Sequence, residues 1–188
     1  MSFTLVYWGG MQKFLGRGWA PMMILEEAGA TYECKTPEDK PPVTFAPPMI
    51  ITPCGVQVSQ VAVIGMALGK ELNMWPTGAN ELKAMQLCCD SADMLSDGFA
   101  KKGEERMDKW CAHLEAQLEL SEGPFMFGSS LTAADYVIYA GLAMCSSLGD
   151  EAGATSITKC PKLTAFMDEI KKCKGYLAVE AKGLPVMP

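Results

Sequence analysis

The sequence is nearly without histidine, since His113 is the only one among its 188 residues. Eight cysteines are present, but none forms a C-x-x-C pair, so we expect no metal site. No apolar stretch approaches the roughly 20 residues that a membrane span needs. Strand-like sequence begins at Phe3, and we expect no signal or transit peptide before it. These absences favour a cytoplasmic protein without a bound metal.

An excess of basic residues is also missing. The chain carries 16 Lys and Arg against 22 Asp and Glu, a net charge of −6, and the basic residues form no cluster. Such a balance disfavours nucleic acid and anionic membrane surfaces as partners. With 49% apolar and 20% charged residues, the composition is that of an ordinary globular protein. Most cysteines fall on apolar helical faces, which favours free thiols in a reducing compartment.

The segment 45–68 organises the first part of the chain. Its apolar runs Met49–Thr52 and Val56–Val58 are parted by a short turn with a glycine, which predicts a β-hairpin. Two prolines precede the first run, as is typical of strand ends. An apolar helix follows, predicted over Ser59–Gly69 with Ser59 as its N-cap.

Upstream of this hairpin, the pattern predicts a strand over Phe3–Trp8, a helix over Trp19–Ala28 and a strand over Thr31–Lys35. Gly29 is a suitable residue to end that helix. The resulting order, strand, helix, strand, two hairpin strands and helix, is that of a thioredoxin-like domain. We assign this domain to residues 1–74.

Strand signals stop after a linker at Asn73–Gly78. Apolar residues then recur every three or four positions, which predicts helices over Asn80–Lys102 and around Met107–Leu118, and another after Pro161. The stretch Ala133–Cys145 is apolar on nearly all sides and should be the buried centre of a bundle. Residues 79–188 are therefore predicted to form an all-α domain.

Thr132 and Asp135 have the spacing of a capping-box variant at the start of this central helix. In such a box each residue supplies a side-chain partner for the other's backbone N–H. The acidic residue also favours the positive end of the helix dipole. We expect both residues to be structural.

Two of these motifs resemble those of the cytosolic glutathione S-transferases. The proline–strand–turn–strand–helix segment is similar to the part of that family that binds glutathione. The stretch FGSSLTAADYVIYAG resembles the opening of the central helix of its C-terminal domain. The resemblance covers nearly the whole chain and implies a thioredoxin-like domain followed by a helical bundle. It also implies glutathione as co-substrate without a cofactor, a small hydrophobic electrophile, and a homodimer formed through the helix Asn80–Lys102.

Tyr7 stands where the Tyr-type members (sigma, pi, mu and alpha) carry the hydroxyl that stabilises the glutathione thiolate. A free thiol has a pKa near about 8.5, and lowering it by two units requires ~2.7 kcal/mol. One hydrogen bond to a charged acceptor supplies roughly 1.5–3 kcal/mol. A single hydroxyl is therefore almost sufficient. Without the family context, the sequence favours the simpler interpretation that Tyr7 is a packed strand aromatic.

The resemblance also assigns the remaining glutathione contacts. Gln60 matches the residue that holds the γ-glutamyl end, whereas Val61 replaces a hydroxyl residue. Either Pro47 or Pro48 can be the family's cis-proline; we favour Pro47, because Ala46 before it then keeps a backbone N–H for glutathione. A basic residue, Lys40, is placed to meet the glycyl carboxylate, or is an ordinary solvated loop lysine.

One further position departs from the family. Segment 93–102 resembles the helix whose acidic residue reaches glutathione across the dimer, and Lys101 falls at the acidic position. These departures leave two hypotheses. The chain is a glutathione transferase with a weakened glutathione site, or it is a non-catalytic protein of the same fold that acts as a structural or binding subunit of a larger assembly.

Overall fold

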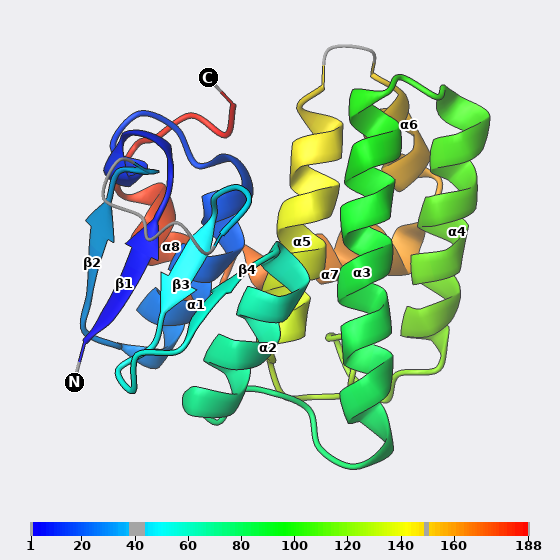
Figure 1. Ribbon diagram of the computed structural model, residues 1–188. Coiled ribbons are helices and arrows are strands. Elements are labelled where there is room, and N and C mark those ends of the chain that lie inside the picture. Colours follow the sequence, from blue (N-terminus) through cyan, green and yellow to red (C-terminus); the bar gives the residue numbers. More distant parts are fainter. Residues whose placement is uncertain (1, 38–43, 149–150, 188) are drawn as a thin grey trace.

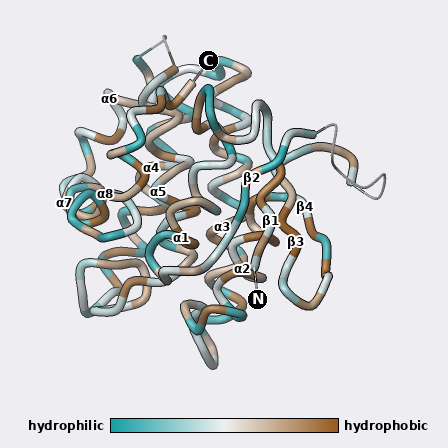
Figure 2. Tube along the Cα trace, turned by 90° about the vertical axis from the view of Figure 1, so that its left-hand side faces the viewer, coloured by the Kyte–Doolittle hydropathy of each residue, from teal (hydrophilic) through white to brown (hydrophobic). Residues whose placement is uncertain are grey.

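A four-stranded mixed sheet forms the first part of the computed structural model, which describes residues 2–37, 44–148 and 151–187 (Figure 1). Strand β1 pairs in parallel with β2 and antiparallel with β3, which pairs antiparallel with β4, giving the order β2-β1-β3-β4. The strands are β1 (Phe3–Val6), β2 (Tyr32–Lys35), β3 (Met49–Ile51) and β4 (Gln57–Ser59). In Figure 2 the sheet shows as the apolar band through β1 and β3.

The hairpin ends one residue later than predicted. Ser59 pairs with Met49 and is the last residue of β4, so it does not cap a helix. Helix α2 (Val61–Glu71) begins after Gln60, which turns the chain with a φ of 72°. The prediction that Ser59 is the N-cap is therefore wrong, because the strand register keeps this residue in the sheet.

The peptide bond between Pro47 and Pro48 is cis, so Pro48 is the cis residue. Our preference for Pro47 is wrong. Both prolines can accept this isomer, and the cis residue is the one that directly adjoins β3 at Met49. The residue before it is Pro47, which has no backbone N–H.

Helix α1 (Trp19–Ala28) packs beside the sheet, with α2 and α8 (Lys174–Glu180) as neighbours. Two short 3₁₀ turns, η1 (Trp8–Met11) and η2 (Gly16–Gly18), connect β1 to α1. The bounds of α1 match the predicted helix, and Gly29 ends it in the left-handed conformation.

The helical part surrounds α5 (Ala133–Ser146), in which all residues except Ala143 and Ser146 are buried. This helix contacts α1 and α2 of the first part as well as α3 and α6. The other helices are α3 (Ala79–Phe99), α4 (Glu104–Glu119), α6 (Ala152–Thr158) and α7 (Pro161–Ile170). No named strand follows β4 in the described ranges. The predicted fold class, a thioredoxin-like domain with a helical bundle, is confirmed.

The predicted capping box is present at the start of α5. Asp135 Oδ2 accepts hydrogen bonds from the Thr132 backbone N–H at 2.8 Å and from Thr132 Oγ1 at 2.6 Å. Its other oxygen accepts from the Met126 N–H at 2.9 Å, a contact that the sequence did not predict. The fully buried carboxylate thus ties the preceding loop to the helix.

All eight cysteines are free thiols. Among the helices described, none combines the length and the apolar character required to cross a membrane. Within the same ranges, no group of three or more His, Cys, Asp and Glu side chains is arranged to hold a metal ion.

Candidate active site

Tyr7 follows β1 directly, and hydrogen bonds hold both its backbone N–H and its side-chain hydroxyl. Its backbone N–H donates to Lys35 O at 3.0 Å, and its hydroxyl accepts from the Arg17 backbone N–H at 2.9 Å. The side chain is 5% exposed and packs edge-on against Phe14. Gly16 has a φ of +45°, and a Cβ there would lie 2.4 Å from Tyr7 Oη. Only glycine lets this turn approach the hydroxyl so closely.

The Tyr7 proton has no protein acceptor among the described residues, because the hydroxyl only receives the Arg17 N–H. Burial raises the pKa of Tyr7, while the Arg17 N–H and then the Arg17 guanidinium act to lower it. The net direction is upward, so the phenol is protonated at neutral pH. It can therefore donate a hydrogen bond to an anion.

Tyr7 lines a cavity of about 370 Å³, which we name the Tyr7 hollow. Pro47 lies on its wall, as do Phe99 at the end of α3 and Met144 on α5. The aromatic and thioether side chains make this wall largely apolar.

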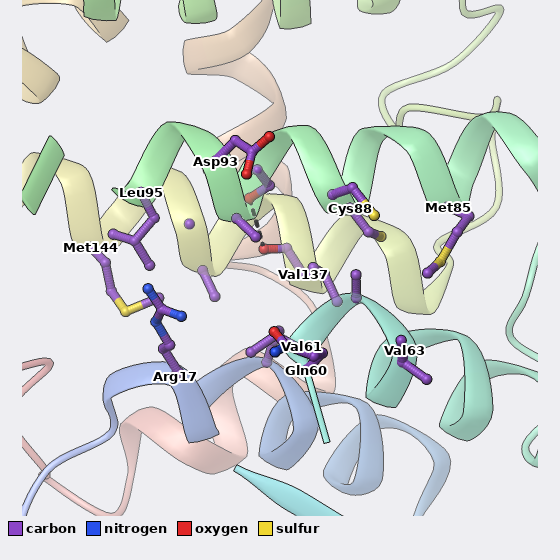
Figure 3. A pocket seen from close by; sticks show the side chains of 17 residues that line it. Arg17, Gln60, Val61, Val63, Met85, Cys88, Asp93, Leu95, Val137 and Met144 are labelled. Carbon is purple, nitrogen blue, oxygen red and sulfur yellow. Dashed lines mark hydrogen bonds between the residues drawn. The ribbon is translucent and has the colours of Figure 1, made fainter. Parts of the chain in front are cut away.

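A second cavity of about 290 Å³, the Gln60 cleft, lies between the start of α2 and the helices α3 and α5 (Figure 3). Val61, the first residue of α2, and Gln60 just before it border this cleft and face Val137 of α5. Among its described lining residues, Asp93 supplies the carboxylate and Arg17 the guanidinium. The remaining wall is mostly apolar.

Arg17 and Met144 line both cavities, so the Tyr7 hollow and the Gln60 cleft adjoin there. In Figure 3 the Arg17 side chain extends from η2, just before α1, toward Met144. No side-chain hydrogen bond or ion pair joins its guanidinium to another described residue. Arg17 is a candidate site residue that the sequence analysis did not predict.

The predicted glutathione residues are therefore distributed over two adjoining cavities. Tyr7 and Pro47 line the Tyr7 hollow, and Gln60 and Val61 line the Gln60 cleft. Ala46 is exposed and lines neither cavity. The residue Lys40 lies outside the described residues.

The prediction that Lys101 occupies a position within the helix is wrong, whereas its place opposite glutathione across a dimer stays a prediction. Helix α3 ends at Phe99, and Lys101 follows with a φ of 51°. It lines neither the Tyr7 hollow nor the Gln60 cleft. The apolar period continues to Phe99, but the left-handed backbone at Lys101 turns the chain toward α4.

Comparisons with known proteins agree with this architecture. Residues 88–178 match the family described as "Glutathione S-transferase, C-terminal domain". The structure is similar to that of the glutathione S-transferase from Ascaris lumbricoides, with 22% identity, a TM-score of 0.78 and 97% of each chain covered.

Two further nematode structures are similar. For the Pi-class enzyme of Onchocerca volvulus the TM-score is 0.77 at 17% identity, with 100% of this chain and 98% of that chain covered. For a Caenorhabditis elegans glutathione S-transferase the TM-score is 0.76 at 22% identity, with 100% and 99% covered. No curated protein matches the sequence significantly. The chain thus has the glutathione S-transferase fold, and a segment within its helical part matches that family's C-terminal domain.

Proposed function

We propose that the protein is a glutathione S-transferase of the Tyr-type group, which adds the glutathione thiolate to small hydrophobic electrophiles. One observation carries this proposal: the buried Tyr7 hydroxyl is oriented by the Arg17 N–H, and its own proton has no acceptor among the described residues. Tyr7 lines the Tyr7 hollow, where a ligand can supply that acceptor.

A thiolate is the acceptor that best fits this proton. Hydrogen bonds to charged groups contribute roughly 1.5–3 kcal/mol, which is close to the ~2.7 kcal/mol needed to lower a thiol pKa by two units. Because the Tyr7 oxygen also accepts the Arg17 N–H, its hydroxyl becomes a stronger donor. The Arg17 guanidinium, which has no ion-pair partner in the described ranges, adds positive potential beside the same cavity.

The Gln60 cleft then receives the γ-glutamyl end of glutathione. Gln60 can bind its carboxylate, and Asp93 offers a negative charge for its ammonium group. Val61 provides a backbone N–H at the helix start but no hydroxyl. The missing contact costs about 0.5–1.5 kcal/mol, or roughly two- to tenfold in affinity. We therefore propose a functional but weakened glutathione site.

The apolar wall of the Tyr7 hollow suits the electrophile. Phe99, Met144 and Met187 surround the space beside the Tyr7 hydroxyl. A small hydrophobic molecule there would lie within reach of the thiolate. Because the protein would hold both reactants in place, their reaction would be accelerated. The free cysteines suit the reducing cytoplasm, where we place the protein.

Calorimetry with glutathione, followed by a conjugation assay with a small aromatic halide, tests the proposal. We expect measurable but weak glutathione binding, and conjugation that requires Tyr7. Tight glutathione binding by the unmodified protein would contradict the proposal of a weakened site. Absence of both glutathione binding and conjugation would contradict the proposal that the protein is an enzyme.

A non-catalytic role in a larger assembly is the second candidate, and two observations favour it. Pro47, on the wall of the Tyr7 hollow, has no backbone N–H to offer, and Val61 has no hydroxyl. A protein that binds no glutathione even after Val61→Ser would support this candidate.

A further inference from the structure

Residues 184–187, which we name the C-terminal strap, run across the turn between β1 and α1 (Figure 1). The Leu15 N–H donates to Pro185 O at 2.9 Å, and the Gly16 N–H donates to Val186 O at 2.8 Å. The side chains of Leu184, Val186 and Met187 pack against the hydrophobic core. Two segments 170 positions apart in sequence are thus joined by backbone bonds and apolar contacts.

The next amide after these two belongs to Arg17, and it donates to the Tyr7 hydroxyl. Three consecutive N–H groups, of Leu15, Gly16 and Arg17, therefore each have a fixed acceptor. Two acceptors belong to the strap and the third is the candidate catalytic group. Without the strap, the amides of Leu15 and Gly16 would exchange these fixed carbonyl acceptors for mobile water. The turn would then lose the two bonds that fix its position.

We propose that the C-terminal strap is a positioning element for Tyr7. It fixes the turn at Leu15–Arg17 so that the Arg17 N–H stays on the Tyr7 oxygen and the Arg17 guanidinium stays beside the hollow. Pro185 and Val186 act through their backbone carbonyls, whereas Met187 contributes a side chain to the cavity wall. The effect on catalysis rests on the proposed function, but the coupling between strap and turn does not.

Amide hydrogen exchange measured by NMR tests the coupling directly. In a variant that ends at Gly183, we expect the Arg17 amide to exchange at least about tenfold faster, the loss equivalent to ~1.4 kcal/mol of protection. Met187→Ala keeps both carbonyl acceptors and should leave Arg17 exchange unchanged. The exchange rate of the Ile138 amide in α5 should be unchanged in both variants, which would show that the core stays folded. Unchanged Arg17 protection in the shortened chain would overturn the proposal.

If the shortened chain does not fold, the double variant Leu184→Ser, Val186→Ser serves instead, because it removes two of the three apolar anchors of the strap while keeping its backbone. Faster Arg17 exchange is again expected, and unchanged protection again overturns the coupling.

A second readout addresses catalysis. In the shortened chain the acidic limb of the kcat/KM profile should move up by about one pH unit, because the glutathione thiolate loses one well-oriented hydrogen bond. In Met187→Ala the acidic limb should stay at the parent's pH, while the KM of bulky electrophiles should change. An unmoved limb together with fast Arg17 exchange would contradict the catalytic role of the strap. If the parent binds no glutathione, the proposed function fails, and the exchange experiment still decides the coupling.

Discussion

Tyr7 and Arg17 share one hydrogen bond, and its direction determines what the phenol can do. The Arg17 N–H donates and the Tyr7 oxygen accepts, so the phenol proton remains for a ligand. A tyrosine that instead donated to a protein carboxylate would have used this proton. Tyr32 is such a case, since its hydroxyl donates to Glu26 at 2.6 Å.

This contrast gives a matched pair of variants. Tyr7→Phe should abolish conjugation, because no hydroxyl then stabilises the thiolate. Its cost in stability should be modest, about 1–3 kcal/mol for leaving the Arg17 N–H without an acceptor. Tyr32→Phe removes an equivalent hydroxyl away from both cavities and should keep the activity. Conjugation rates and thermal unfolding of both variants check this, and a fully active Tyr7→Phe protein would refute the role of Tyr7.

Val61 offers a second test at a single position. Val61→Ser should tighten glutathione binding by roughly two- to tenfold, the worth of one neutral hydrogen bond. Val63→Ser is the control, because Val63 lines the same cleft from the same helix. Calorimetry should show tighter binding for the first variant only. Equal gains in both would mean that polarity alone, rather than a specific contact, was missing.

The sequence predicted Tyr7, Gln60 and Val61 as site residues, and the structure places all three at adjoining cavities; whether they bind glutathione stays a prediction. Arg17 was missed because its contact with the Tyr7 hydroxyl forms across a turn, which no local pattern encodes. Its neighbour Gly16 gave the only local signal, a glycine where a side chain would strike the Tyr7 hydroxyl.

Among the elements, helices with strong end signals were predicted best. Trp19–Ala28 was located to the residue because Gly29 supplies a left-handed C-cap. The predicted helix Asn80–Lys102 ran past Phe99, since Lys101 adopts a left-handed conformation that its residue type does not announce. Ser59 was misassigned for a related reason: cap preference is local, whereas strand register is set by the partner at Met49.

The capping box of α5 carries a prediction about pH. Burial raises the pKa of Asp135 to about 6, although hydrogen bonds from Thr132 and Met126 oppose the rise. An unfolded aspartate titrates near about 3.9, so between about pH 4 and 6 the native state binds more protons than the unfolded state. The contribution of Asp135 to the free energy of unfolding should therefore fall as pH rises through this interval and level off above it.

Asp135→Asn should remove that slope, since an amide does not titrate. It should also destabilise the protein, because its NH₂ group would face the donors of Thr132. Denaturant unfolding of parent and variant from pH 4 to 7 measures the difference. A difference between the two proteins that stays constant with pH would contradict the raised pKa.

At the scale of the whole molecule, α5 joins the two parts. Gly65 of α2 lies so close to it that a Cβ would be 2.6 Å from Val137 Cγ2. The order of elements in the sequence was enough to predict the fold class. The two adjoining cavities were not predictable, because side-chain packing between distant segments forms them: the Gln60 cleft lies between α2, α3 and α5, and the Tyr7 hollow lies between the turn after β1 and the residues Phe99 and Met144.

We also predict that the whole molecule forms a homodimer through α3. Leu82 on this helix is 81% exposed, so its side chain is available for contact with a partner subunit. Burying it contributes about 1.5–3 kcal/mol, and two-fold symmetry counts the contact twice. Leu82→Glu should therefore weaken a dimer by roughly a hundredfold or more. Leu120→Glu is the control, since Leu120 is 80% exposed after the end of α4. Sedimentation at micromolar concentration should show dimers for the parent and the control and monomers for Leu82→Glu, all with similar unfolding midpoints. A parent that sediments as a clean monomer would rule out the dimer.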